Sequence, residues 1–184
     1  MNTCKRFSLA LIAMMSTGAA TAADVQLPSN LPHRKPGLWT VQITHGGKIL
    51  SGPKMCLDER TDAALYKWGV TQNKECSRLD VKVRGNEVVV DGVCKAPAGR
   101  GTMTTHAVTR FEGDSASHGE EVVHYDPPQD GVSDDTVVVD SRWIGPCEAG
   151  QKPGDVIIAP GMHINVLDDD GPAALLKNLL RSGN

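Results

Sequence analysis

The feature that most constrains this fold is the alternating segment between Arg78 and Cys94. Valine or leucine alternates with a charged residue up to Gly85-Asn86, and a run of valines follows. Period-two alternation is typical of a strand with one buried face. Glycine and asparagine readily adopt the positive φ angles of a two-residue hairpin turn. The segment therefore predicts an antiparallel hairpin that pairs Val83 with Val88.

Other segments have the same character, and short glycine-containing turns such as Gly46-Gly47 and Gly113-Asp114 separate several of them. A polar, proline-rich stretch at 126–131 is expected to break the sequence of strands. Successive strands with short connections are typical of an antiparallel meander. We therefore predict a mainly β (α+β) fold, either an antiparallel β meander or a curved sheet or partial barrel. The additional predicted strands are 38–44, 48–57, 102–112, 115–125 and 136–144.

Two helices are expected to accompany these strands. A short inserted helix is predicted from Thr61, as its N-cap, to Trp68, with Gly69 ending it. A C-terminal helix is predicted to begin at Asp170 and to pack a leucine stripe on the same domain. That stripe consists of Leu175, Leu176, Leu179 and Leu180.

The N-terminal residues are typical of a secretory signal peptide. A basic Lys5-Arg6 pair precedes an apolar stretch, and the small residues at 20–22 resemble a cleavage site. No other apolar run approaches the roughly 18 residues that a transmembrane helix needs. We expect a periplasmic or secreted protein with no transmembrane segment. The predicted organisation is a signal peptide (1–22), an extended N-terminal arm (23–36), a disulfide-bridged β domain (37–147), and a loop with the C-terminal helix (148–184).

Removal of the signal peptide takes Cys4 with it and leaves Cys56, Cys76, Cys94 and Cys147. An even number of cysteines in an exported chain predicts two disulfides. The chain has no Cys-x-x-Cys pair, which argues against a zinc site or thioredoxin-like chemistry.

The hairpin register bears on the pairing of these cysteines. It places Cys76 opposite Lys95, on the face away from Cys94, and so disfavours a Cys76–Cys94 bridge. Two pairings remain open: Cys56–Cys76 with Cys94–Cys147, which we prefer because the first bridge closes the helical excursion, and Cys56–Cys94 with Cys76–Cys147.

Several short motifs in the sequence resemble parts of known functional sites, but none predicts an active site. Nucleic acid is not an expected partner, because aromatic residues make up 4% of the chain and its net charge is −3. Gly113-Asp114-Ser115 resembles the nucleophile block of lipase-like hydrolases. No histidine has an aspartate three residues before it, however, and a hairpin turn explains the motif.

Two candidate metal sites are also disfavoured. His118, Glu120 and His124 share one strand face, but such neighbours lie about 7 Å apart and cannot converge on one ion, and His106 is expected on the other face. The run 168–171 resembles a calcium loop but would place Lys177 where an acidic ligand is required. The remaining acids, Asp130, Asp134, Asp135 and Asp140, are interpreted as a solvated rim. We predict no catalytic, cofactor or metal site.

Several short motifs together resemble a known family. The chain contains Arg34-Lys35-Pro36-Gly37-Leu38-Trp39, the four cysteines, the Gly113-Asp114 turn and Arg142-Trp143-Ile144-Gly145-Pro146-Cys147. In this order they resemble the domain-of-unknown-function family 3617 over roughly residues 34–147. The resemblance implies an exported, cysteine-bridged β domain of Gram-negative bacteria. The family carries no established activity, so no catalytic residue transfers from it.

Our functional hypothesis is a monomeric, non-enzymatic envelope protein that needs no cofactor and holds an apolar or lipid-like ligand between the sheet and the terminal helix. The alternative is a periplasmic interaction module that docks on another envelope protein through the arm or the leucine stripe. Hydrolysis is a third and weaker hypothesis, because no hydrolytic site is assembled.

Overall fold

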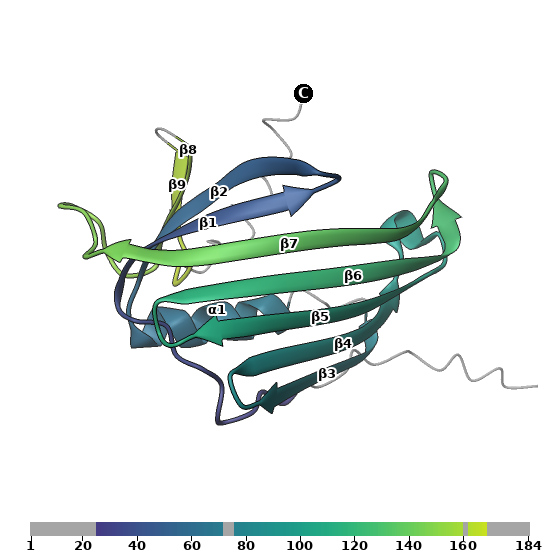
Figure 1. Ribbon diagram of the computed structural model, residues 1–184, viewed down its shortest axis with the longest axis horizontal. Helices are drawn as coiled ribbons and strands as arrows, with labels where there is room; N and C mark the ends of the chain where they lie inside the picture. Colours follow the sequence, from purple (N-terminus) through teal and green to yellow (C-terminus); the bar gives the residue numbers. More distant parts are fainter. Residues whose placement is uncertain (1–24, 72–75, 160–161, 169–184) are drawn as a thin grey trace, which may run out of the picture.

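The computed structural model describes residues 25–71, 76–159 and 162–168. Its strands form one nine-stranded antiparallel sheet in the order β3-β4-β5-β6-β7-β1-β2-β8-β9 (Figure 1). The predicted mainly β class is confirmed. The predicted signal peptide and C-terminal helix lie outside the described residues. The strands are β1 (Gly37–His45), β2 (Lys48–Leu57), β3 (Cys76–Arg84), β4 (Glu87–Lys95), β5 (Thr102–Glu112), β6 (Ala116–Gln129), β7 (Val132–Gly145), β8 (Asp155–Ala159) and β9 (Met162–Asn165).

The predicted hairpins at Gly85-Asn86 and Gly113-Asp114 are confirmed, the first of them also in its central register. Val83 pairs with Val88 across the β3–β4 turn, where Gly85 has a φ of +63°. The β5–β6 hairpin turns at Gly113, which has a φ of +61°. Strand β1 then leaves this meander order, because it pairs with β2 on one side and with β7 on the other.

The strands extend further than the sequence predicted. The proline-containing stretch interrupts the β6–β7 register between His124 and Gln129 but does not end the strand, because β6 continues to Gln129 and the chain turns at Asp130-Gly131 into β7. The segment after Cys147, predicted to be loop, instead forms β8 and β9 at the β2 edge. Val156 of β8 and Ile164 of β9 are buried in a core cluster with residues that are distant in sequence. Because these contacts are not local, the sequence pattern around 155–165 did not predict the two strands. That cluster consists of Trp39, Met55, Leu57, Val156 and Ile164.

Helix α1 (Glu59–Thr71) begins two residues earlier than predicted. The carboxylate of Asp58 accepts a hydrogen bond from the backbone N–H of Thr61 at 2.8 Å, and the Thr61 hydroxyl accepts one from the N–H of Asp58 at 2.7 Å. Asp58 is therefore the N-cap, and Thr61 completes a reciprocal capping box. The backbone bond from Thr61 lowers the pKa of Asp58. Gly69 does not end the helix, which continues to Thr71.

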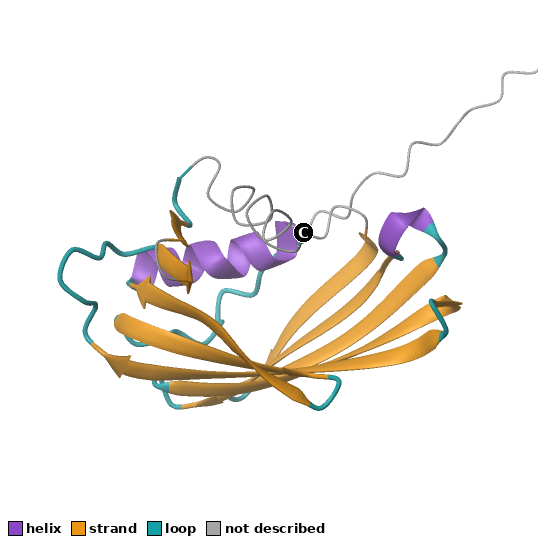
Figure 2. Cartoon of the chain, turned by 90° about the horizontal axis from the view of Figure 1, so that it is seen from above, coloured by secondary structure: helices purple, strands orange, loops and turns teal. Residues whose placement is uncertain are grey.

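The sheet curves along its length, and α1 lies over its concave face (Figure 2). A short 3₁₀ helix, η1 (Pro97–Gly99), connects β4 to β5. In the part of the chain that the structure describes, no helix is long and apolar enough to cross a membrane.

The disulfides join Cys56 to Cys147 and Cys76 to Cys94. Two bridges were predicted, but both pairings left open by the sequence are wrong. The register of the β3–β4 hairpin shifts between Cys76 and Arg78, so that Ser77 is an extra residue on β3. This β-bulge places Cys76 directly opposite Cys94, whereas an uninterrupted register would place it opposite Lys95.

Peptide mapping of the non-reduced protein is expected to find these two linkages and no free thiol. The partners of the first bridge are 91 residues apart and those of the second are 18 apart. In the chain-entropy description, their loss costs about 4.5 and about 3 kcal/mol respectively. Urea unfolding should therefore show a larger loss for Cys56→Ser with Cys147→Ser than for Cys76→Ser with Cys94→Ser. A Cys56–Cys76 peptide, or the reverse ranking, would contradict this assignment.

Candidate functional site

A cavity of about 460 Å³ lies between the concave face of the sheet, helix α1 and the N-terminal arm. Its volume falls within the roughly 300–1,000 Å³ range that is typical of small-molecule pockets. Leu65 and Tyr66 of α1 and Leu27 and Arg34 of the arm face the inward-pointing side chains of the strands across it. The cavity is therefore built from parts of the chain that are distant in sequence.

The sequence of the central strands explains why the cavity is hollow. Several inward-facing positions of β5, β6 and β7 carry small side chains beside larger ones such as Met103 and Phe111; the small ones are Ala107, Ser117, Gly119 and Ser141. The strands β3 and β4 carry larger apolar side chains at the corresponding positions. The small side chains near the middle of the concave face and the larger apolar ones on β3 and β4 together form a depression with apolar walls. These larger lining residues are Leu79, Val81, Val88 and Val90.

One acidic side chain, Glu121, is among the residues that line the cavity. It is partly buried, and its Oε1 atom accepts a hydrogen bond of 2.6 Å from the hydroxyl of Thr105. Both residues belong to the concave face at the centre of the sheet. The cavity thus combines an apolar lining with a fixed polar group.

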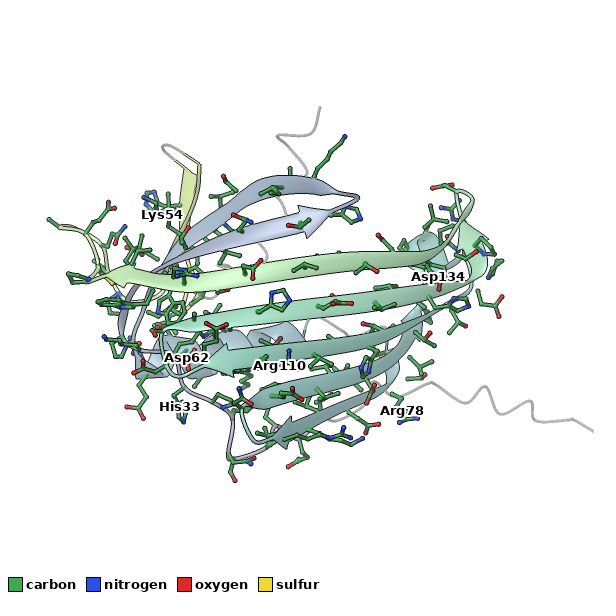
Figure 3. All side chains as sticks on the ribbon, viewed as in Figure 1. His33, Lys54, Asp62, Arg78, Arg110 and Asp134 are labelled. Atoms are coloured by element: carbon green, nitrogen blue, oxygen red, sulfur yellow. A yellow bond between two sulfur atoms is a disulfide. The ribbon has the colours of Figure 1, made fainter. Side chains whose placement is uncertain are left out.

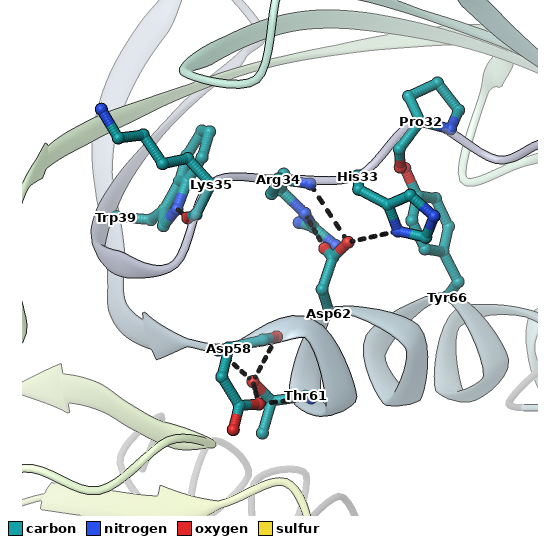
Figure 4. Close-up of polar contacts among 9 residues, drawn as sticks. All are labelled: Pro32, His33, Arg34, Lys35, Trp39, Asp58, Thr61, Asp62 and Tyr66. Carbon is teal, nitrogen blue, oxygen red and sulfur yellow. Dashed lines mark hydrogen bonds and ion pairs between the residues drawn. The ribbon is translucent and has the colours of Figure 1, made fainter.

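The N-terminal arm, which covers one side of the cavity, is attached to α1 through Asp62 (Figure 4). The side chain of Asp62 is 0% exposed. The backbone N–H of Arg34 donates to Asp62 Oδ2 at 3.2 Å, and the Nε of Arg34 donates to Oδ1. The Nδ1 atom of His33 lies 3.7 Å from Oδ2. The extended arm is consequently fixed on the helix, a contact between residues 28 apart for which the sequence offers no local signal.

Tyr66 makes a second attachment between α1 and the arm. Its hydroxyl donates to the carbonyl oxygen of Pro32 at 2.8 Å, and the guanidinium of Arg34 lies 5.3 Å from the ring centroid. Burial raises the pKa of Tyr66 to about 12, with a further contribution from Asp62 and a partial offset by Arg34.

The histidines considered as metal ligands lie on the convex face, away from the cavity. His106 and His118 line a shallow depression there together with Arg110, which is labelled in Figure 3. His124 lies six residues after His118 on β6 and so shares its face. The prediction for His106 is wrong: it pairs in register with Val122, so it shares the face of His118, Glu120 and His124. Alternation within each strand does not show which face of β5 matches which face of β6, because that depends on the register across the turn at Gly113-Asp114.

Each of these three histidines is hydrogen-bonded to an aspartate on the adjacent strand. The distances are 2.7 Å for His106–Asp91, 2.7 Å for His118–Asp140 and 2.8 Å for His124–Asp134. Within the described ranges, no group of three His, Cys, Asp or Glu side chains is arranged to hold a metal ion.

The motif weighed as a hydrolase block forms the β5–β6 turn. The carbonyl oxygen of Asp114 accepts from the N–H of Lys35, and that of Ser115 accepts from the N–H of Trp143, each at 2.8 Å. The turn therefore connects the arm and β7 to the hairpin. Of the run weighed as a calcium loop, residues 169–171 lie outside the described residues.

Removal of the cation beside Asp62 should strongly destabilise the protein. Arg34→Met removes the closest cation from a buried carboxylate and leaves, among the described residues, only the exposed His33 near it, so it is expected to cost about 3–5 kcal/mol in urea unfolding. The double variant Arg34→Met with Asp62→Leu should recover much of that loss, because it leaves no uncompensated charge. Equal stability of Arg34→Met and the native protein would contradict the contact.

The phenol of Tyr66 should titrate late. Because its folded pKa is above the unfolded value of about 10, its contribution to stability is present below pH 10 and is lost as the pH rises toward 12. Ultraviolet titration of the folded protein should show a phenolate step near pH 12 that is missing in Tyr66→Phe. Persistence of that step in the variant would refute the assignment.

The family comparison agrees with the short motifs noted in the sequence. A family model for a protein of unknown function, DUF3617, matches residues 34–147. No curated protein and no solved structure gives a significant match. The matched segment runs from the arginine that contacts Asp62 to the last disulfide cysteine and covers more than half of the sequence. The chain therefore belongs to the DUF3617 family.

Proposed function

We propose that this protein is a non-enzymatic, exported binding protein that holds an apolar, lipid-like molecule in the cavity under α1. The observation that carries the proposal is the cavity itself, with a volume of about 460 Å³ and a largely apolar lining. Apolar side chains exposed to a water-filled hollow gain free energy when an apolar ligand displaces that water. The curved sheet, with α1 over its concave face, also provides a preformed container (Figure 2).

The predicted signal peptide supports export to the periplasm or beyond. Two disulfides are compatible with such a location, because thiols are oxidised there. A binding protein in this compartment would meet apolar molecules that need shielding from water.

A second candidate is an interaction module that docks on another envelope protein. It is favoured by the tip of the β1–β2 hairpin, where Ile49 is 68% and Leu50 is 52% exposed. As successive residues of β2, these two side chains point to opposite faces, so a partner would contact the hairpin tip on both sides. The two candidates differ in whether the cavity is occupied.

Filling the cavity should prevent binding without loss of the fold. Ala107 lines the cavity, and the adjacent Val108 lies on the convex face. In Ala107→Phe, the affinity for the neutral apolar dye Nile red is expected to fall at least tenfold. The matched variant Val108→Phe should bind as the native protein does.

Native mass spectrometry of protein purified from the periplasm should detect a co-purifying apolar molecule, which Ala107→Phe should lack. The melting temperature of each variant checks its fold. If the native protein neither retains a ligand nor binds Nile red, the proposal is wrong and the interaction module is favoured.

A further inference from the structure

We propose that the molecule held in the cavity carries a primary ammonium group, and that the carboxylate of Glu121 is its counter-charge. This inference rests on the proposed function, because it specifies the ligand of the same cavity. It assigns Glu121 as the residue that determines ligand class, a role distinct from the packing of its apolar neighbours.

The position of Glu121 points its carboxylate into the cavity. In the sheet it is paired with Ala107 of β5 and Val137 of β7, and it shares the concave face with Ala107, which also lines the cavity. Its neighbour Glu120 belongs to the convex face and is exposed. The two glutamates are adjacent in sequence but experience different surroundings, water for Glu120 and a partly buried apolar hollow for Glu121.

The charge of Glu121 is not compensated by the described part of the chain. Thr105 donates one hydrogen bond to Oε1, and threonine is neutral. In the described segments, no Lys, Arg or His side chain forms an ion pair with Glu121, and Oε2 has no hydrogen-bond partner there. An ammonium donor would supply both the missing charge and a hydrogen bond to Oε2. Charge-assisted hydrogen bonds of this kind are roughly twice as strong as neutral ones.

The competing cation in the lining, Arg34, does not reverse this preference. Its side chain is 15% exposed and its charge is matched by the wholly buried carboxylate of Asp62. A ligand carboxylate at Arg34 would have to compete with that ion pair. Among the described lining residues, Glu121 therefore carries a negative charge without an ion-pair partner, and electrostatic complementarity favours a cationic ligand.

The test compares three probes with the same twelve-carbon chain: dodecylammonium, dodecanol and dodecanoate. Each displaces Nile red from the full-length native protein at concentrations below its micelle-forming range. We expect dodecylammonium to bind at least tenfold more tightly than dodecanol, and dodecanoate to bind most weakly.

Two charge-removing variants locate the effect. In Glu121→Gln, which keeps an acceptor for Thr105, the preference for the amine over the alcohol is expected to disappear. Glu120→Gln removes the same charge from the convex face and should retain the full preference. Because the probe comparison on the native protein stands without any variant, it decides the matter even if Glu121→Gln is unstable.

The outcomes separate this inference from the function on which it rests. Equal binding of amine and alcohol, tighter binding of dodecanoate, or an undiminished preference in a folded Glu121→Gln would overturn the ammonium assignment. In those cases Nile red binding would still support a cavity for apolar ligands. Failure of the native protein to bind Nile red and all three probes would instead refute the proposed function.

Discussion

The pairing of β1 with both β2 and β7 is the interaction on which the rest of the structure depends. It joins the first hairpin to the β3–β7 meander and produces one continuous sheet. At this junction the indole N–H of Trp39, which is 0% exposed, donates to Lys35 O at 2.8 Å, and that of Trp143 donates to Pro36 O at 3.0 Å. These bonds direct the arm away from the sheet and toward α1. The pairing therefore completes the sheet that lines one side of the cavity, and it also positions Arg34 of the arm on the opposite side.

The cavity forms where the concave face of the curved sheet carries small side chains beneath α1. That face must be covered by apolar groups, yet β5, β6 and β7 present small side chains such as Gly119 and Ser141 at their centre. In the described part of the chain, α1 covers this floor without filling the space above it, so volume remains between them. A side chain at Gly119 would be crowded, because its Cβ would lie 3.1 Å from Thr109 Oγ1, so the close approach of Thr109 favours glycine at this position. The small residues leave space under α1, and this space is the basis of the binding role proposed above.

Local patterns predicted much of this fold because they depend on neighbours in sequence. The alternation before Gly85 gave both the hairpin and its central register, and the glycine turns gave the other hairpin ends. Features that depend on distant residues were missed. The bulge at Ser77 changed the disulfide pairing, β8 and β9 depend on burial against Met55 and Leu57, and the Arg34–Asp62 contact joins the arm to a helix that local sequence does not connect to it. For the same reason, Glu121 is indistinguishable from Glu120 until the register is known.

Charged side chains have different partners on the two faces of the sheet, and this difference concerns Glu121 in the cavity. On the convex face, charges are matched across strands, as in Arg110–Glu87 at 2.6 Å and His106–Asp91 at 2.7 Å, and the latter contact lowers the pKa of Asp91. Each exposed pair contributes little to stability because water screens it. On the concave face, less water is available to solvate Glu121, so an unmatched charge there is more costly than on the surface. Among the described residues, several charges on the convex face are paired, whereas Glu121 on the concave face forms no ion pair, and this contrast is the basis of the cationic ligand proposed above.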